Sequence, residues 1–154
     1  MPGSQPIAYA RGMTPAQVFD LANLLPLPIW AVWIVAPRSQ AARLLAGALW
    51  PWAVLGALYV AVLAIGMAEQ GGFDPHAFGS LDGVMRLFQS PWIAVAGWVH
   101  YLCFDLFVAR WIVNDAPDAG YRRAPVLLLT FLFGPLGLVT YLLARPALRR
   151  PREA

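Results

Sequence analysis

The chain contains no lysine: its basic residues are eleven arginines, which stand against eight carboxylates and give a formal net charge of +3. A retinal Schiff base or a pyridoxal phosphate linkage requires a lysine amine, so both chemistries are excluded. Charged residues of either sign make up only 12% of the 154 residues. Because the arginines stand at the ends of apolar runs, headgroup anchoring explains them, and no nucleic acid partner is expected.

Cysteine is almost as scarce. Cys103 is the only one, so the monomer has no internal disulfide, no CxxC redox pair and no CxxCH haem attachment. Asp20, His100, Asp105 and Asp115 supply ligand types suited to a metal, but no HxxxH or ExxH spacing accompanies them. We therefore expect no metal and no other cofactor.

Hydrophobic residues make up 60% of the chain. Its mean hydropathy is +0.60, which is well above that of an ordinary soluble domain. The sequence predicts an all-α polytopic membrane protein, a four-helix bundle with proline-broken spans that forms a single transmembrane domain over residues 1–154. The predicted spans are about 15–36, 41–68, 91–113 and 125–144, with a short interfacial helix at about 80–89.

Capping residues predict where the first of these helices begins, and prolines predict where the helices are interrupted. Thr14 and Gln17 form a capping box around Pro15, which predicts the start of the first span. Prolines then interrupt three spans at similar depths, namely Pro26 and Pro28, Pro51, and Pro135. Because broken helices expose backbone groups that lipid does not tolerate, we expect them to line a protein-enclosed cavity at mid-membrane.

The predicted third span carries His100, Asp105 and Arg110 inside an otherwise apolar run. An ionised aspartate or arginine near the centre of a span costs roughly 2.5 to 3.5 kcal/mol, so such residues normally face protein or a wet cavity. At about 100° per residue, His100 and Asp105 point roughly 140° apart, and each needs its own partner on a neighbouring helix. They are the candidate catalytic residues.

Other polar and aromatic side chains near the spans are candidate binding residues, and Asp20 and Asn23 of the first span are natural partners for the third. The candidates are Asp20, Asn23, Trp98, Tyr101, Arg110, Trp111, Asn114 and Asp115. A purely structural interpretation remains for them all. In that case Asp105 is a packed or arginine-paired group, His100 donates to a carbonyl across a helix interface, and Arg110 is paired or snorkels.

The run WVHYLCFDLFVARWIVND, with Trp98, His100, Asp105 and Arg110, resembles the signature of the abscisic-acid-deficient-four-like membrane proteins, the neoxanthin-synthase family. Two flanking patches agree, FDLAN at 19–23 and FGPLG at 133–137, and the similarity covers roughly residues 15–144. The resemblance implies a four-span membrane protein of xanthophyll metabolism, in which violaxanthin is isomerised to allenic neoxanthin.

Two hypotheses of function follow. The first is redox-neutral isomerisation of a carotenoid or related isoprenoid, which needs one proton delivered to an epoxide oxygen and one removed from the adjacent polyene carbon. Asp105 would be the acid and neutral His100 the base, or the reverse. The aromatic residues that would flank a cationic intermediate are Trp98, Tyr101, Phe104 and Trp111. The alternative is a non-catalytic carotenoid-binding or lipid-binding protein or scaffold, which predicts a narrow apolar groove.

The expected partners are a lipophilic substrate and membrane lipids, and a homo-oligomer is left open. Basic content supplied only by arginine indicates a high-GC bacterial genome, so we expect an integral protein of the bacterial inner membrane. With four spans, six arginines on one side against four on the other favour cytoplasmic termini.

Overall fold

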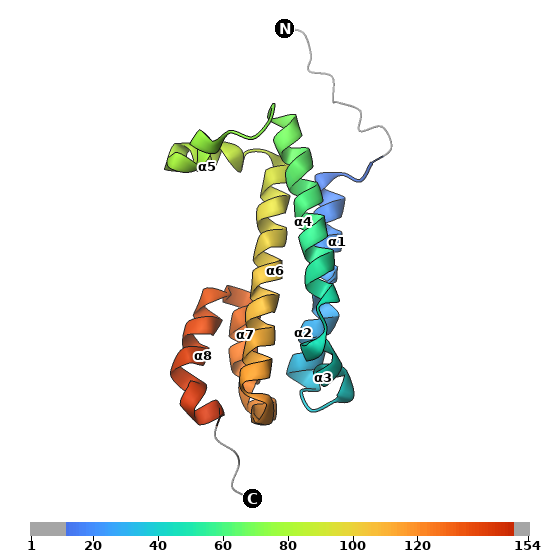
Figure 1. Ribbon diagram of the computed structural model, residues 1–154, viewed down its shortest axis with the longest axis vertical. Helices are drawn as coiled ribbons and strands as arrows, with labels where there is room; N and C mark the ends of the chain where they lie inside the picture. The colour runs from blue at the N-terminus through green and yellow to red at the C-terminus, as the bar shows by residue number, and fades with distance from the viewer. Residues whose placement is uncertain (1–11, 150–154) are drawn as a thin grey trace, which may run out of the picture.

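The computed structural model describes residues 12–149, and the elements within that range are all helical. They are α1 (Pro15–Leu24), α2 (Leu27–Val35), α3 (Gln40–Gly47), α4 (Trp50–Glu69), η1 (Pro75–Gly79), α5 (Leu81–Leu87), α6 (Pro91–Asp115), η2 (Pro117–Arg123), α7 (Ala124–Phe133) and α8 (Pro135–Leu148). The all-helical fold class is confirmed. The short helix predicted at about 80–89 is α5, which lies across one end of the molecule (Figure 1).

Three segments have the length and apolarity of membrane spans: Pro15–Val35, Trp50–Glu69 and Pro91–Asp115. They run side by side along the long axis, with α6 packed against both α4 and α1 (Figure 1). Large apolar side chains on their outer faces are exposed, for example Val35 at 70% and Val60 at 63%. A lipid environment explains such extensive apolar exposure, because water would disfavour it.

The helix starts follow local chemistry. At α1, the Thr14 side chain accepts from the Gln17 backbone N–H while the Gln17 side chain accepts from the Thr14 N–H, so the predicted capping box is confirmed. Buried Pro26 separates α1 from α2. The second span begins later than predicted, at Trp50, because Ala48 takes an extended conformation after α3 and Pro51 opens α4.

The predicted fourth span over 125–144 is broken at Gly134 and Pro135, as the sequence indicates, but its two parts do not continue in one direction. α7 ends at Phe133, the chain reverses at Gly134 (φ 46°, ψ −95°), and α8 returns beside α7 as a hairpin of two half-helices (Figure 1). Pro135 needs no hydrogen-bond acceptor at the start of α8, and Gly137 has no Cβ to collide with Thr130 of α7. The described residues therefore contain three span-length segments and one hairpin.

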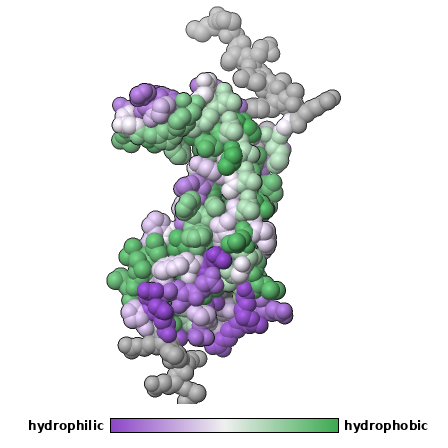
Figure 2. Space-filling model, viewed as in Figure 1, coloured by the Kyte–Doolittle hydropathy of each residue, from purple (hydrophilic) through white to green (hydrophobic). Residues whose placement is uncertain are grey.

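Because the last apolar segment is a hairpin, the two ends of the described chain do not lie on the same side, as four spans would require. The start of α1 and the end of α8 lie at opposite ends of the molecule (Figure 1), so the expectation that both termini share one side is not supported, although the termini themselves lie outside residues 12–149. Figure 2 shows hydrophilic surface gathered at the end that holds α3 and η2. Most of the described arginines belong to the loops and helix ends there: Arg38, Arg43, Arg122, Arg123, Arg145 and Arg149.

Two hydrophobic clusters share α6. Val99 belongs to the cluster near α1 and α4, which contains Ala22 and Val62. Leu106 belongs to the cluster with α2, α7 and α8, which contains Trp33 and Tyr141. The stretch 100–105 of α6 therefore joins the two packed regions, with Leu102 packed against the first cluster and Cys103 against the second.

Candidate functional site

His100 lies on the side of α6 that α1 and α7 do not cover. Its ring stacks on Phe104 at 4.5 Å between centroids and tilts against Tyr59 of α4 at 5.7 Å. The side chain is exposed, but it faces an apolar groove of about 520 Å³ that it helps to line. His100 is thus one of the few polar groups in a hydrophobic recess.

The groove is formed by α4, η1, α5 and α6 and is enclosed mainly by aliphatic and aromatic side chains. Its lining is Tyr59, Leu63, Met67, Phe73, Phe78, Val84, Leu87, Phe88, Ile93, Ala96, Gly97 and His100. A Cβ at Gly97 would come within 2.7 Å of the Phe88 ring, so glycine allows α5 to close over α6. Figure 2 shows the hydrophobic underside of α5 above the recess in the middle of the molecule. The sequence did not locate this groove, because its walls form only when the consecutive elements from α4 to α6 fold back on one another.

Asp105 lies beneath the tip of the α7–α8 hairpin and is only 9% exposed. A Cβ at Gly134 would approach Asp105 Oδ1 to 2.5 Å, so the turn packs directly on the carboxyl group. The side chain interacts with Tyr101, one helical turn away, and Oδ2 has no hydrogen-bond partner among the described residues. A buried carboxyl with an unsatisfied oxygen is costly to retain and is a candidate for chemistry.

A line of contacts leads from Asp105 to the first span. The ring centroids of Tyr101 and Trp98 are 5.5 Å apart, and Trp98 Nε1 donates to Asn23 Oδ1 at 2.9 Å. Asn23, Trp98, Tyr101 and Asp105 therefore lie together, as four predicted site residues. Asp20 does not join them: it is exposed and has no hydrogen bond or ion pair with any described residue.

His100 and Asp105 do not face one enclosed polar chamber, which corrects the expectation of a shared cavity at mid-membrane. Pro26 and Pro51 do meet, but with Leu106 they line an apolar void of only about 80 Å³ that neither polar residue reaches. At the first of these breaks the Pro26 carbonyl accepts from the Ile29 and Trp30 N–H groups, which form the first turn of α2.

Arg110 and Asn114 hold α3 against α6. Arg110 Nε and Asn114 Nδ2 both donate to the Ala46 carbonyl, at 2.8 and 3.2 Å, in the last turn of α3. The Arg110 guanidinium also lies over the Trp52 ring, 5.2 Å from its centroid. These contacts satisfy one carbonyl at the end of α3 and favour a structural role for both predicted binding residues.

Asp115 and Trp111 hold α8. Asp115 accepts from Arg145 through both carboxylate oxygens at 2.7 Å and from the Tyr141 hydroxyl at 2.5 Å. The Trp111 and Tyr141 rings pack edge to face with their centroids 5.2 Å apart, and the Arg145 guanidinium carbon lies 5.9 Å from the Trp111 ring centroid. A bidentate arginine–carboxylate pair is among the stronger polar contacts in proteins, so this cluster fixes the hairpin to α6.

Replacing Asp115 by asparagine is expected to lower the thermal unfolding midpoint by several degrees, because asparagine cannot accept both Arg145 hydrogen bonds as an anion. The matched control is Asp118→Asn, since Asp118 has no ion pair among the described residues. Circular dichroism in detergent measures both midpoints. Equal midpoints for the two variants would contradict an anchoring role for Asp115.

Within residues 12–149, no three histidine, cysteine, aspartate or glutamate side chains lie close enough to hold a metal ion. The described chain is instead a small polytopic helical protein with span-length apolar helices, a half-helix hairpin against α6, and an apolar groove with one imidazole.

This chain belongs to the ABA DEFICIENT 4-like family, whose model matches residues 17–141, from the capping box of α1 to Tyr141 of α8. It is 26% identical over 134 residues to "Protein ABA DEFICIENT 4, chloroplastic" of Arabidopsis thaliana. That match covers 84% of this chain and 61% of the relative, so the chain spans about three fifths of the relative's length. No solved structure matches the chain.

Proposed function

We propose that this protein isomerises a carotenoid or a related isoprenoid within the bilayer of a bacterial inner membrane, opening an epoxide to an allene. The observation that carries the proposal is His100, an imidazole at an apolar groove between span-length helices, in a chain of the ABA DEFICIENT 4-like family. The reaction is balanced without a cofactor. One proton adds to the epoxide oxygen as its C–O bond breaks, and another leaves the adjacent polyene carbon as the allene forms.

The roles follow from the surroundings of each group. His100 is open to the groove and is assigned as the base, while Asp105 and its neighbour Tyr101 are assigned as the proton donor. Along α6 the two positions are separated by about 7.5 Å of helical rise, and Tyr101 points between them. A polyene end group lying along this surface, beside Phe104, would contact His100 and Tyr101, and the buried Asp105 would act through Tyr101.

The His100→Gln variant is expected to convert a supplied epoxycarotenoid about tenfold more slowly than the parent, because a base is lost from a groove where water can substitute only in part. Chromatography of pigments extracted from membranes that contain the protein measures the conversion. The control is His76→Gln, which changes the other histidine, an exposed residue of η1 outside the groove lining.

Parental conversion by a folded His100→Gln protein would remove His100 from the reaction. Loss of conversion in both histidine variants would indicate a general disturbance near α5 and would also count against the assignment.

The second candidate, a non-catalytic carotenoid-binding or lipid-binding protein or scaffold, is favoured by the apolar lining and by the separation of His100 from Asp105. Solvent extraction and mass analysis of lipids bound to the purified protein separate the two functions. A bound polyene that remains unchanged in parent, His100→Gln and Asp105→Asn proteins would support binding alone.

A further inference from the structure

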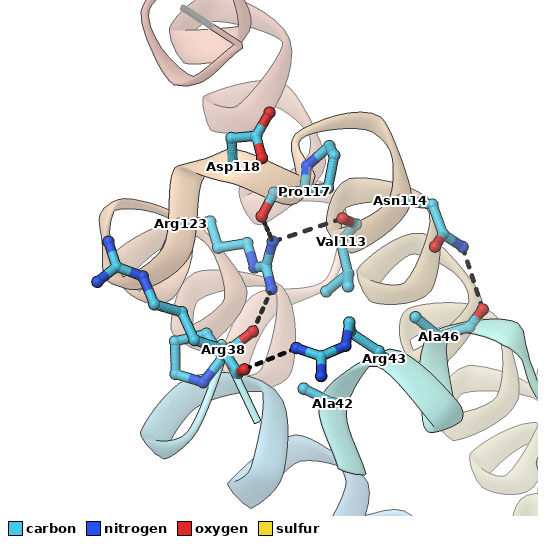
Figure 3. A pocket seen from close by; sticks show the side chains of 10 residues that line it. Arg38, Ala42, Arg43, Ala46, Val113, Asn114, Pro117, Asp118 and Arg123 are labelled. Carbon is cyan, nitrogen blue, oxygen red and sulfur yellow. Dashed lines mark hydrogen bonds between the residues drawn. The ribbon is translucent and has the colours of Figure 1, made fainter. Parts of the chain in front are cut away.

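A cavity of about 560 Å³ lies at the arginine-rich end, far from the groove of His100, where the α2–α3 turn meets α3, the last turn of α6 and η2 (Figure 3). Three arginines line it, Arg38, Arg43 and Arg123, with a single carboxylate, Asp118. Asp118 forms no ion pair among the described residues. The cavity is therefore strongly positive.

Arg123 is the buried member of the group, only 2% exposed. Its Nη1 donates to the Ala116 and Pro117 carbonyls at 2.9 and 3.2 Å, and its Nη2 donates to the Pro37 carbonyl at 3.2 Å. Its Nε is buried without a hydrogen-bond partner among residues 12–149. All these acceptors are neutral, and burial lowers the pKa of the Arg123 guanidinium. A buried cation without a counter-charge is unfavourable, so an anion in the cavity would offset the free energy spent on removing the guanidinium from water.

Arg43 and Arg38 extend the positive field from Arg123 to the rim. Arg43 donates one hydrogen bond, from Nη1 to the Arg38 carbonyl at 3.0 Å, and Figure 3 shows the guanidinium groups of Arg43 and Arg123 each bonded to a carbonyl of the α2–α3 turn. The Arg38 guanidinium makes no hydrogen bond with the described chain and lies over Gly120, where a Cβ would come within 3.0 Å of Nε. Several donors are thus free for a ligand.

The geometry points to a phosphate-binding site at the membrane surface, with a phosphate group as the ligand. Guanidinium groups match the geometry of phosphate oxygens, and two or more of them around one cavity form a typical phosphate site. The depth also fits, because Pro37 follows the last residue of the first span by two positions and Val113 lies in the last turn of α6. The phosphate could be that of an anionic lipid headgroup or free phosphate.

Native mass spectrometry of the full chain in an uncharged detergent tests the site, with phosphatidylglycerol in one arm and inorganic phosphate in the other. Arg43→Gln is expected to bind phosphatidylglycerol about tenfold more weakly than the parent, whereas Arg43→Lys keeps the charge and stays within about threefold. The control is Arg86→Gln, an exposed arginine of α5 at the opposite end. Arg38→Gln provides a second variant that loses no hydrogen bond to the described chain.

Lipid binding that is lost in Arg43→Gln and Arg38→Gln but kept in Arg86→Gln supports a lipid headgroup as the source. Inorganic phosphate that binds to the parent and to Arg86→Gln, but not to these two variants, supports free phosphate. If Arg43→Gln and Arg38→Gln match Arg86→Gln in both arms, the proposal is overturned.

Discussion

Conversion of an epoxycarotenoid is expected to fall about a thousandfold in the Asp105→Asn variant, while its helical content and unfolding midpoint stay near those of the parent. Asparagine has almost the same shape as aspartic acid, so the packing beneath Gly134 is retained. It cannot deliver a proton, and general acid catalysis typically contributes about a hundred- to ten-thousandfold. The loss exceeds that of His100→Gln, because water has little access to a side chain that is only 9% exposed.

The matched control is Glu69→Gln, which neutralises an exposed carboxylate at the end of α4 and outside the groove lining. It should convert the substrate at the parental rate in the same membranes. A folded Asp105→Asn protein that converts the epoxide as fast as Glu69→Gln would eliminate Asp105 as the acid. The remaining explanation would be that the buried carboxyl only supports the hairpin.

Gly134→Ala is expected to destabilise the protein by about 3 kcal/mol or more, and to reduce the amount recovered folded. Two costs add at this residue. A φ of 46° with a ψ of −95° is strained for a residue with a Cβ, and that Cβ would lie 2.5 Å from Asp105 Oδ1. Since the hairpin tip rests on a buried side chain of a long helix, the neighbours have little room to relax.

Gly56→Ala makes the same chemical change in the middle of α4, where a Cβ would meet nothing within 4 Å. This control should be neutral or slightly stabilising, because alanine is the better helix former by roughly 0.5 to 1 kcal/mol. Thermal unfolding in detergent compares the two proteins. Equal midpoints would mean that the hairpin does not require glycine at residue 134.

These two variants separate the roles of one contact. Asp105 and Gly134 meet at the turn between α7 and α8, yet Asp105→Asn should keep its stability and lose most of its activity, whereas Gly134→Ala should lose stability. The FGPLG patch at 133–137 is therefore explained as a turn that lets a half-helix return beside α7 and cover a carboxyl group of α6.

Part of the candidate site could be predicted from the sequence. Helical periodicity predicted that His100 and Asp105 point in different directions, and the structure places them on different contacts, with Tyr59 and Phe104 for His100 and with Gly134 for Asp105. Periodicity does not say which neighbouring helix approaches each side. The sequence therefore left open that a groove would receive one residue and a hairpin tip the other.

The structural roles of the arginines were harder to predict. Arg110 was a binding candidate and Arg123 was not, yet Arg110 caps α3 while Arg123 is buried in the positive cavity. Both side chains bind backbone carbonyls, and the carbonyls they reach at Ala46 and Pro37 lie 64 and 86 residues away along the chain. No local pattern carries that information.

The sequence by itself determined the helical class, the apolar spans and their caps, because hydropathy, proline and capping chemistry act over a few residues and need no partner. Only the tertiary structure decided that the last apolar segment is a hairpin, that the groove closes over His100, and that three arginines share one cavity. The physical reason is that a length of apolar residues is equally compatible with one span or two half-helices. The choice depends on the contacts of Gly134 and Gly137 with Asp105 and Thr130, which exist only once the helices have packed.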